Sequence, residues 1–322
     1  MLASRALHAA SRRLPEASIQ QKYEQWMAEH GRIYADSEDR SKRLEIFADN
    51  LRFIEDFNHA GNHTFKLGSN AFLDRTVEEF LELSTGLALP STLHPRNMSH
   101  ANSTHIPHSM DWVAKGAVNA IKDQGGCGSC WAFSAVAAIE SITQIKTGKL
   151  LELSEQQLVD CTVDNYGCGG GWMDTAFDYV IRNGGITSEK NYPYNASDEI
   201  CHAHAASMSV AKIVGYENVP ANNEGNLLKA VAMQPVSVAL DASGREFQLY
   251  SSGVFNGNCG TTMCHAVAIV GYGTAKDGTK YWKIRNSWGK TWGEAGYMRI
   301  QRGYARPEGL CGLAMHASYP VV

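Results

Sequence analysis

The sequence predicts an α+β protein in which a helical lobe and an antiparallel, barrel-like strand lobe follow a separate helical segment. Three patterns lead to this prediction. Apolar residues recur at helical spacing between residues 19 and 83, a stretch that contains none of the eight cysteines. A helical pattern also begins at Cys130, whereas short β-branched runs dominate after residue 235. A chain of 322 residues, 44% of them hydrophobic, can hold about two domains with a sizeable core.

Residues 1–18 form an N-terminal tail of unclear role. The part up to Pro15 carries three arginines and no apolar stretch of the length that a secretory signal needs. We therefore expect that the chain lacks a signal segment or has an atypical one.

Residues 19–83 are expected to be helical. Apolar side chains fall at helical spacing at Tyr23, Trp26, Met27, Leu44, Phe47, Leu51 and Ile54. This spacing alone also fits an ordinary helical domain. Residues 84–105 are rich in Ser, Thr, Asn and His, which is typical of an exposed linker. The two lobes are expected in residues 106–322.

The helical lobe is expected first. One helix begins at Cys130, directly after a glycine-rich loop. A second follows Ser154, where residues 154–157 predict a capping box, and a third spans residues 173–182 and stops at Gly184. In the strand lobe, antiparallel strands are predicted at 236–240, 266–270, 281–285 and 297–302.

Cys130 is the strongest candidate for a reactive residue. It lies at the start of the expected helix, where unpaired backbone N–H groups and the positive end of the helix dipole favour an ionised sulfur. A thiolate, rather than a thiol, attacks carbonyl carbon. The spacing Cys127-x-x-Cys130 alone also fits two disulfide partners, a redox pair or half of a zinc site.

Three other residues can complete a site around this thiol. Gln124 can donate its side-chain amide, together with the backbone N–H of Cys130, to a developing oxyanion. His265 begins an apolar run that predicts a buried strand, and Asn286 follows another predicted strand. Each has an ordinary interpretation when taken alone: a solvated glutamine, a core histidine and an asparagine in a turn.

Together these residues resemble a papain-type cysteine peptidase precursor of the plant kind. The run Cys127-Gly128-Ser129-Cys130-Trp131 matches the nucleophile signature of that family without a change. Gln124, His265 and the run Asn286-Ser287-Trp288-Gly289 fall in the family's order. The resemblance covers nearly everything from about residue 20 onward. It implies the papain-like two-lobe fold, with a helical left lobe and an antiparallel, barrel-like right lobe.

The resemblance implies a cysteine-type endopeptidase that is made as a zymogen. Cys130 would form a thiolate–imidazolium pair with His265 and attack the peptide carbonyl to give a thioester. Gln124 and the Cys130 N–H would hold the oxyanion. Asn286 would orient the imidazole, and Trp288 would shield their hydrogen bond from water. This chemistry needs no cofactor and no metal.

One residue departs from the family pattern. The residue before the catalytic histidine is usually Asp or Asn, but here it is Cys264. A neutral thiol stands where an acidic neighbour would influence the titration of the histidine. We therefore expect a shifted pH–rate profile rather than an inactive enzyme.

The resemblance also implies how the cysteines pair: Cys127 with Cys168, Cys161 with Cys201, and Cys259 with Cys311. Spacing alone leaves open a competition of Cys264 for Cys259. Disulfides indicate an oxidising compartment, so we expect the secretory pathway, with the vacuole, the lysosome or the extracellular space as destination. Weak support for this comes from four Asn-x-Ser/Thr glycosylation tripeptides, at Asn62, Asn97, Asn102 and Asn195.

Substrate-binding residues follow only from their position in the family. Gly128, Gly170 and Gly171 would let a substrate backbone approach closely. The pocket for the second residue upstream of the cut is expected to prefer Leu, Val or Phe, and a protonated histidine at its floor would admit an acidic side chain. The residues expected to line this pocket are Trp172, Met173, Ala239, Met263, Ala266 and His316. Trp288 is expected beside the site as a further substrate-binding residue. Some of these, Ala239 above all, fit a plain core role as well.

By the same resemblance, residues 19–83 are an inhibitory prosegment. Two prosegment patterns are matched, one by Arg43, Phe47, Asn50, Ile54 and Asn58, the other by Gly68, Asn70, Phe72 and Asp74. The helices would pack on the mature enzyme, and the strand after them would run through its cleft in the non-productive direction. Loss of charge on Asp74 and its neighbours in acid would release the prosegment. Cleavage within the linker 84–105 would leave a mature enzyme that begins near Ile106.

The expected partners are protein and peptide substrates, the chain's own prosegment and cystatin-like inhibitors, and the protein is expected to be a monomer. A net charge of −4 gives no basis for binding nucleic acid or an anionic membrane. No apolar stretch reaches the roughly 18 residues of a membrane span. Adjacent Cys264 and His265 are not spaced as a zinc-chelating pair. Two alternatives stay open: a catalytically silent papain-like binding or storage protein, and a thiol–disulfide oxidoreductase.

Overall fold

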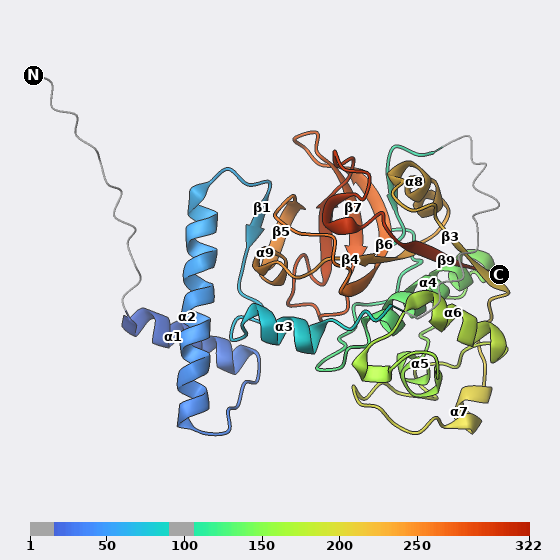
Figure 1. Cartoon of the computed structure of the whole chain (residues 1–322), viewed down its shortest axis with the longest axis horizontal. Helices are drawn as coiled ribbons and strands as arrows, with labels where there is room; N and C mark the ends of the chain where they lie inside the picture. The colour runs from blue at the N-terminus through green and yellow to red at the C-terminus, as the bar shows by residue number, and fades with distance from the viewer. Residues whose placement is uncertain (1–15, 90–105) are drawn as a thin grey trace, which may run out of the picture.

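The computed structural model describes residues 16–89 and 106–322 (Figure 1). N-terminal helices, drawn in blue and cyan, lie on one side of a central sheet, and a lobe of further helices lies on its other side. The tail up to residue 15 and the expected linker from residue 90 to 105 lie outside the described residues.

The N-terminal segment contains the helices α1 Glu16–Glu29, α2 Ser37–Ala60 and α3 Val77–Ser84. The helical pattern predicted for residues 19–83 is therefore confirmed. The rings of Tyr23 and Trp26 on α1 pack against Phe47 on α2, with centroids 5.1 Å and 5.5 Å apart. This aromatic cluster fixes the crossing of the two helices that Figure 1 shows.

Local signals set the ends of these helices. Asp36 caps α2 by accepting the backbone N–H groups of Glu38 and Asp39, and Gly61 ends it in a left-handed conformation with φ 80°. Thr76 and Glu79 form a complete capping box at the start of α3.

The described residues contain one sheet of nine strands: β1 Phe65–Leu67, β2 Met110–Asp111, β3 Gly215–Asn218, β4 Val236–Leu240, β5 Tyr250–Phe255, β6 His265–Thr274, β7 Lys280–Arg285, β8 Tyr297–Gln301 and β9 Ala317–Val321. Their order is β1-β5-β8-β7-β6-β4-β9-β3, and β2 pairs with β6 beside this path. The four predicted strands correspond to β4, β6, β7 and β8, which pair antiparallel with one another as expected.

The predicted two-lobe fold is confirmed, and the sheet of the strand lobe is open. Among the described strands, β1 and β3 stand at the two ends of the order. One pair, β5 with β8, is parallel, whereas an all-antiparallel lobe was expected. The free edge of β5 is covered by β1, which comes from the N-terminal segment and not from the lobe itself.

The helical lobe contains α4 Cys130–Thr147, α5 Glu155–Cys161, the 3₁₀ turn η1 Gly167–Gly169, α6 Met173–Arg182 and α7 Ala203–Ser207. The helices α8 Glu224–Met233 and α9 Arg245–Gln248 and the 3₁₀ turn η2 Leu310–Gly312 accompany the sheet.

The capping box predicted at residues 154–157 is only half formed. Ser154 Oγ accepts the backbone N–H of Gln157 at 2.9 Å. The return bond is missing because the buried Gln157 side chain is used across the lobe, where its Oε1 accepts the N–H of Thr187 at 2.8 Å.

Helix α4 lies at the junction of the two lobes and is buried on all sides from Cys130 to Thr143. Ser134 Oγ donates to Val267 O on β6 (2.8 Å), and Ser237 Oγ on β4 donates to Ser134 O (3.0 Å). These bonds fix the N-terminal part of α4 against the beginning of β6.

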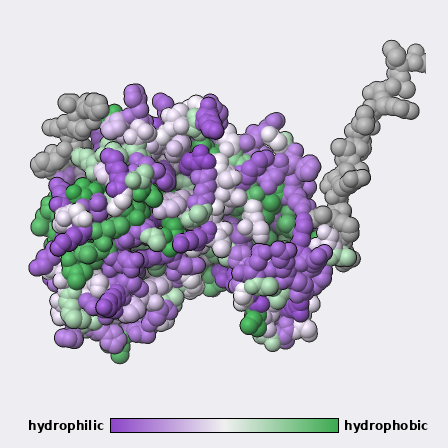
Figure 2. Space-filling view, turned by 180° about the vertical axis from the view of Figure 1, so that it is seen from behind, coloured by the Kyte–Doolittle hydropathy of each residue, from purple (hydrophilic) through white to green (hydrophobic). Residues whose placement is uncertain are grey.

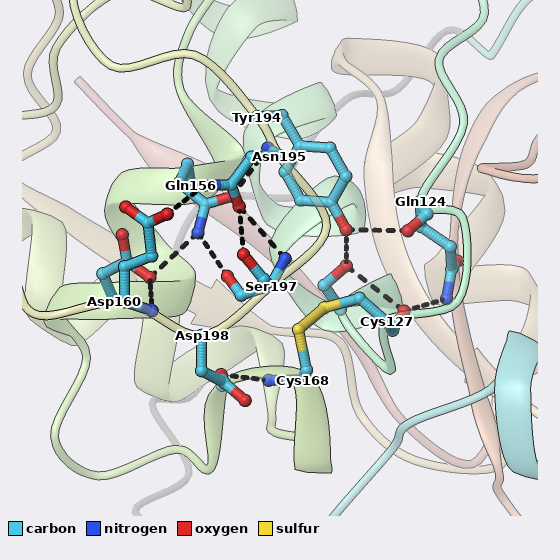
Figure 3. Close-up of a disulfide and its surroundings, with 12 residues drawn as sticks. Gln124, Cys127, Gln156, Asp160, Cys168, Tyr194, Asn195, Ser197 and Asp198 are labelled. Atoms are coloured by element: carbon cyan, nitrogen blue, oxygen red, sulfur yellow. Dashed lines mark hydrogen bonds between the residues drawn. A yellow bond between two sulfur atoms is a disulfide. The ribbon is translucent and has the colours of Figure 1, made fainter.

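Three disulfides join the pairs that the resemblance implied: Cys127–Cys168, Cys161–Cys201 and Cys259–Cys311. Cys130 and Cys264 are the free cysteines. The first disulfide ties the loop before α4 to η1 and is drawn in Figure 3.

The surface is largely hydrophilic when the molecule is seen from behind. Hydrophobic residues gather on the larger body, on the side away from the N-terminal helices (Figure 2). No helix of the described part is both long and apolar enough to cross a membrane. Within residues 16–89 and 106–322, no three His, Cys, Asp or Glu side chains converge as a metal ion would need.

Candidate active site

Cys130 is the first residue of α4 and directly follows Ser129 at the N-cap position. Its thiol is completely buried. Burial raises the pKa of the Cys130 thiol to about 12, and hydrogen bonds from the backbone of Ala266, Trp131 and Gly86 offset this only in part. The bond from Ala266, the residue after His265, brings the sulfur to the start of β6.

His265 is the first residue of β6 and is also completely buried. Its Nε2 lies 2.8 Å from Asn286 Oδ1, and the same oxygen accepts the backbone N–H of Ser287 at 2.8 Å. Because an amide oxygen only accepts, Nε2 carries the ring proton. Nδ1 has no hydrogen-bond partner among the described residues. It is therefore the basic nitrogen that can take a proton from a thiol.

Trp288 covers this pair. Its ring stacks on the His265 ring, with centroids 4.3 Å apart and planes inclined by 21°. Burial lowers the pKa of His265 to about 4, against the opposite influence of the Asn286 hydrogen bond. The predicted shielding of the His265–Asn286 bond matches this geometry.

The expected thiolate–imidazolium pair is not the form favoured in this structure. The pKa of Cys130 is raised and that of His265 is lowered, so near neutral pH both groups are uncharged. The physical reason is the exclusion of water by the segment that covers the site, because burial disfavours the charged form of each group.

Gln124 is buried rather than solvated. Its Oε1 accepts the hydroxyl of Ser287 at 2.6 Å, which fixes the orientation of the side-chain amide. Its Nε2 donates to Cys127 O at 3.0 Å and to Ser84 O at 3.2 Å. The amide therefore points at a carbonyl oxygen that is supplied by the N-terminal segment.

Residues 84–88 run through the cleft between the lobes. Ser84 O also accepts the indole N–H of Trp288 (2.8 Å), and the N–H groups of Gly86 and Leu87 donate to Cys264 O at 3.2 Å and 3.1 Å. Gly171 N donates to Gly86 O and Ala88 N donates to Gly171 O, each at 3.0 Å, in a parallel bridge. The start of the predicted exposed linker is thus buried in the cleft, because its backbone finds hydrogen-bond partners on both walls.

Glycines allow this close approach. A Cβ at Gly86 would collide with the backbone carbonyl of Gly128, and a Cβ at Gly170 would lie 2.9 Å from Gly86 O. Two of the glycines predicted to receive a substrate, Gly128 and Gly170, therefore already receive an extended backbone.

The expected apolar pocket exists as a packed cluster. Trp172, Met173, Ala239 and Ala266 are almost completely buried in it, and Met263 packs against it. Leu87 of the covering segment packs against the same cluster. A leucine side chain of the covering segment therefore packs on the cluster that contains Trp172, Met173, Ala239 and Ala266.

His316 is not a free acceptor for an acidic side chain. Its ring lies against the Trp172 ring at a tilt of 53° (4.5 Å between centroids), and its Nε2 lies 3.2 Å from Asp174 Oδ1. Burial acts to raise the pKa of Asp174, but the hydrogen bond with His316 and further bonds outweigh it, so the pKa is lowered. The charge of a protonated His316 is thus already balanced, which argues against the expected acceptance of an acidic residue.

Cys264 lies beside the site without a charge. Its Sγ accepts the backbone N–H of Ala242 at 3.3 Å, and burial raises its pKa to about 11. The expected glycosylation sites Asn62 and Asn195 are exposed, whereas Asn97 and Asn102 lie outside the described residues. Glycosylation stays a prediction.

The sequence patterns assigned no role to several residues around the site: Ser84, Ser129, Asp174, Tyr194 and Ser287, of which Ser129 and Ser287 stand within the quoted motifs. Tyr194 is the clearest case, because its hydroxyl contacts both Gln124 O (2.8 Å) and Ser129 Oγ (2.7 Å); the bond to Gln124 is drawn in Figure 3. Single polar residues in loops carry no spacing signal, and only the fold reveals these contacts.

Comparison with known proteins agrees with this geometry. Residues 106–321 match the papain family of cysteine proteases, and residues 23–80 match the cathepsin propeptide inhibitor domain (I29). The senescence-specific cysteine protease SAG39 of Oryza sativa subsp. japonica is 51% identical over 321 residues, which cover 98% of this chain and 94% of that protein. Fruit bromelain of Ananas comosus is 45% identical and covers 98% of this chain and 90% of its own.

Solved structures are similar as well. The proform of the ragweed pollen allergen Amb a 11, a cysteine protease, superimposes with a TM-score of 0.89 at 44% identity over 98% of both chains. Recombinant stem bromelain precursor gives a TM-score of 0.89 at 43% identity, covering 95% of this chain and 99% of its own.

Proposed function

This chain belongs to the papain family of cysteine proteases and carries its own propeptide inhibitor domain, and on this basis we propose which residues cut the peptide bond and how they are held inactive. The protein is a cysteine endopeptidase made as a zymogen, and its prosegment is an intramolecular inhibitor. Residue roles, domain boundaries and specificity are the proposals that follow.

Cys130 is the nucleophile and His265 the general base and acid. Nδ1 takes the thiol proton, the sulfur attacks the peptide carbonyl carbon, and the carbonyl electron pair moves to oxygen. Collapse of this tetrahedral intermediate forms a thioester and expels the amine, which takes the proton from His265. Water then attacks the thioester, with His265 as base, and releases the new carboxylic acid and the Cys130 thiol.

Gln124 Nε2 and the Cys130 N–H hold the oxyanion, and Asn286 Oδ1 keeps the imidazole in the required tautomer. The observation that carries this assignment is the bond from Gln124 Nε2 to Ser84 O at 3.2 Å. A peptide carbonyl oxygen of the prosegment thus already accepts a hydrogen bond from the proposed oxyanion donor.

The prosegment inhibits by filling the cleft and by keeping the reacting groups neutral. We propose an N-terminal tail 1–18, an inhibitory prosegment 19–83, a linker 84–105 whose first residues block the cleft, and a peptidase domain 106–322. Removal of residues 84–88 readmits water and lets the thiolate–imidazolium pair form at the end of α4.

Substrates are proteins and peptides with an apolar or aromatic residue two positions upstream of the cut. The packing of Leu87 against the apolar cluster that contains Met173, Ala239 and Ala266 supports this preference. We further propose a monomer that is open to cystatin-like inhibitors and resides in the secretory pathway, in the vacuole or lysosome or outside the cell. The three disulfides support an oxidising location.

The test is active-site labelling with an epoxysuccinyl peptide followed by mass mapping. Labelling of Cys130 alone, together with loss of peptide cleavage by the activated chain, is the expected result. Absence of cleavage by the unlabelled activated chain would instead favour a silent binding or storage protein.

A thiol–disulfide oxidoreductase is the other alternative. It requires Cys127 and Cys130 to act as a pair, but Cys127 is bonded to Cys168. Labelling of both Cys127 and Cys130 in the activated chain would revive it.

A further inference from the structure

We propose that the hydroxyl of Tyr194 is a positioning group for the oxyanion hole, holding the two ends of loop 124–130 at a fixed separation. The inference rests on the proposed roles of Gln124 and the Cys130 N–H as oxyanion donors. Tyr194 itself does not touch the reacting atoms in this assignment, and it acts through Gln124 and Ser129.

The two proposed donors belong to opposite ends of a glycine-rich loop, whose middle is tied to η1 by the Cys127–Cys168 disulfide. Gln124 stands at one end and Cys130 at the other, with glycines at 125, 126 and 128 between them. Glycine adopts many backbone conformations, so the sequence of this loop does not by itself fix the distance between the donors. An oxyanion hole works only when both donors are held before the reaction begins.

The Tyr194 hydroxyl joins these two ends. It donates to the backbone carbonyl of Gln124 at 2.8 Å and lies 2.7 Å from Ser129 Oγ. A carbonyl only accepts, so the one phenolic proton goes to Gln124, and the Ser129 hydroxyl must donate to Tyr194. The result is a directed chain from Ser129, the residue before the nucleophile, through Tyr194 to Gln124. The bond between Tyr194 and Gln124 is drawn in Figure 3.

The Tyr194 side chain is itself well anchored. Its ring meets the ring of Phe133 edge-on, with centroids 4.8 Å apart, and its backbone N–H donates to Glu189 Oε1 at 2.9 Å. Burial raises the pKa of the Tyr194 hydroxyl, so it stays protonated and remains a donor over the working pH range. The hydroxyl therefore transmits a fixed position from the helical lobe to the loop.

The other side of Gln124 is held from the strand lobe. Ser287 Oγ donates to its Oε1 (2.6 Å), and the Gln124 N–H donates to Ser287 O (2.9 Å). Tyr194 and Ser287 thus hold Gln124 from the two lobes. Tyr194 connects the Gln124 backbone to Ser129, while Cys127 O connects the Gln124 side chain to the same residue by accepting Gln124 Nε2 (3.0 Å) and the Ser129 N–H (2.8 Å). Loss of Ser287 would disturb the amide directly, whereas loss of the Tyr194 hydroxyl disturbs the spacing between the donors.

The test is Tyr194→Phe in the full chain, activated by removal of its prosegment. This variant keeps the ring on Phe133 and removes only the hydroxyl. Removal of a complete oxyanion donor lowers kcat by about 10²–10³-fold, so misplacement of one is expected to lower kcat by roughly 10-fold or more. KM should stay within about twofold, because the pocket is untouched.

Two inhibitors separate positioning from general loosening. A peptide aldehyde adds to the thiol and forms an oxyanion, so its affinity should fall in parallel with kcat. Iodoacetamide alkylates the thiol without an oxyanion, so its rate of reaction with Cys130 should be unchanged. A merely structural role would change both the aldehyde affinity and the iodoacetamide rate, or neither of them. Either result overturns the inference.

The matched control is Tyr192→Phe. The Tyr192 hydroxyl is two residues away and equally engaged, since it donates to Asp160 Oδ2 (2.7 Å) and accepts the N–H of His202 (3.1 Å). Its loss should lower stability without lowering aldehyde affinity. Equal loss of aldehyde affinity in both variants would also overturn the inference.

Ser129→Ala and Gln124→Ala complete the design. Ser129→Ala removes the first member of the chain and should lower aldehyde affinity less than Tyr194→Phe does, and it tests the inference if Tyr194→Phe does not fold. Gln124→Ala should lower aldehyde affinity most. If Gln124→Ala has no effect, the proposed oxyanion assignment fails, whereas an effect of Gln124→Ala alone rejects only the role of Tyr194.

Discussion

At the scale of single residues, burial decides the charge state of the catalytic pair. Cys130 and His265 are both fully buried, and the pKa of each moves toward its neutral form. The end of α4 favours a thiolate, but a helix terminus contributes only about 0.3–2 kcal/mol. Desolvation of a fully buried group shifts a pKa by as much as about 3–5 units. At about 1.4 kcal/mol per unit, this is a larger free energy than the helix terminus supplies. The closed cleft therefore overrides the helix dipole.

Cys264→Asp tests the departure from the family pattern. A carboxylate beside the pair disfavours the thiolate and favours the imidazolium, so the pKa of both groups should rise. Both limbs of the pH profile of kcat/KM should move to higher pH in the activated enzyme. Cys264→Asn, neutral and of the same size as Asp, is the control and should leave the profile in place. An unchanged profile for Cys264→Asp would show that this position does not tune the pair.

Asp174→Asn tests the corrected view of the pocket floor. In the native enzyme the paired His316 and Asp174 should exclude glutamate two residues upstream of the cut, with kcat/KM at least about tenfold below that for leucine, since each 1.4 kcal/mol is a factor of ten. Asp174→Asn removes the carboxylate that contacts His316 and should raise kcat/KM for the glutamate substrate relative to the leucine substrate. His316→Leu should not improve cleavage of the glutamate substrate. Good cleavage of the glutamate substrate by the native enzyme would contradict the ion pair's role.

At the scale of elements, the strand 84–88 inhibits through its backbone more than through its side chains. Its carbonyl and N–H groups bond to Gln124, Trp288, Cys264 and Gly171. Leu87 is the member that enters the apolar cluster. Because backbone bonds require close approach, the contact of Gly86 with Gly128 limits how near the strand can lie.

Gly86→Ala should loosen this strand. The added Cβ collides with the Gly128 carbonyl, which is backbone and cannot rotate away. We expect the precursor to expose Cys130 more often and to react with iodoacetamide about tenfold faster, a change of about 1.4 kcal/mol in the opening equilibrium. Leu89→Ala, at an exposed position of the same segment, is the control and should leave the rate unchanged. Equal rates for native and Gly86→Ala precursors would mean that the strand does not gate the thiol.

At the scale of the whole molecule, acid should open the precursor because of His265. Its pKa is lowered to about 4 in the closed form, whereas an exposed imidazole titrates near 6.5. The closed form is therefore fully favoured above about pH 6.5 and loses stability as the pH falls toward 4, by up to about 3 kcal/mol.

The measurement is the melting temperature of the inactive Cys130→Ser precursor between pH 7 and pH 4. It should fall over this range, and the double variant Cys130→Ser, His265→Gln should show a smaller fall. If both proteins have the same pH dependence, the acid response comes from Asp74 and other carboxylates rather than from the histidine.

The sequence was sufficient for the strongly periodic elements and for residues within a motif. The helix at Cys130 and the strands around His265 and Asn286 carry spacing that is visible in one dimension, whereas the pairing of the cysteines followed from the family resemblance. The short strand β1 spans only Phe65–Leu67, and β5 begins Tyr-Ser-Ser-Gly, so neither has a clear pattern. Tyr194, Asp174 and the path of residues 84–88 depend on contacts between distant segments, which no local pattern records.

The pairing of β1 with β5 has a consequence for the life of the activated protease. Phe65 and Lys66 lie opposite Gly253 and Ser252, so the prosegment closes an edge that the peptidase cannot cover alone. Proteolytic removal of the prosegment takes β1 away and leaves the backbone amide and carbonyl groups of the β5 edge unpaired and facing solvent. The partner strand of β5 is lost at the same moment. We therefore expect the mature enzyme, once unfolded, to recover its structure less readily than the precursor does.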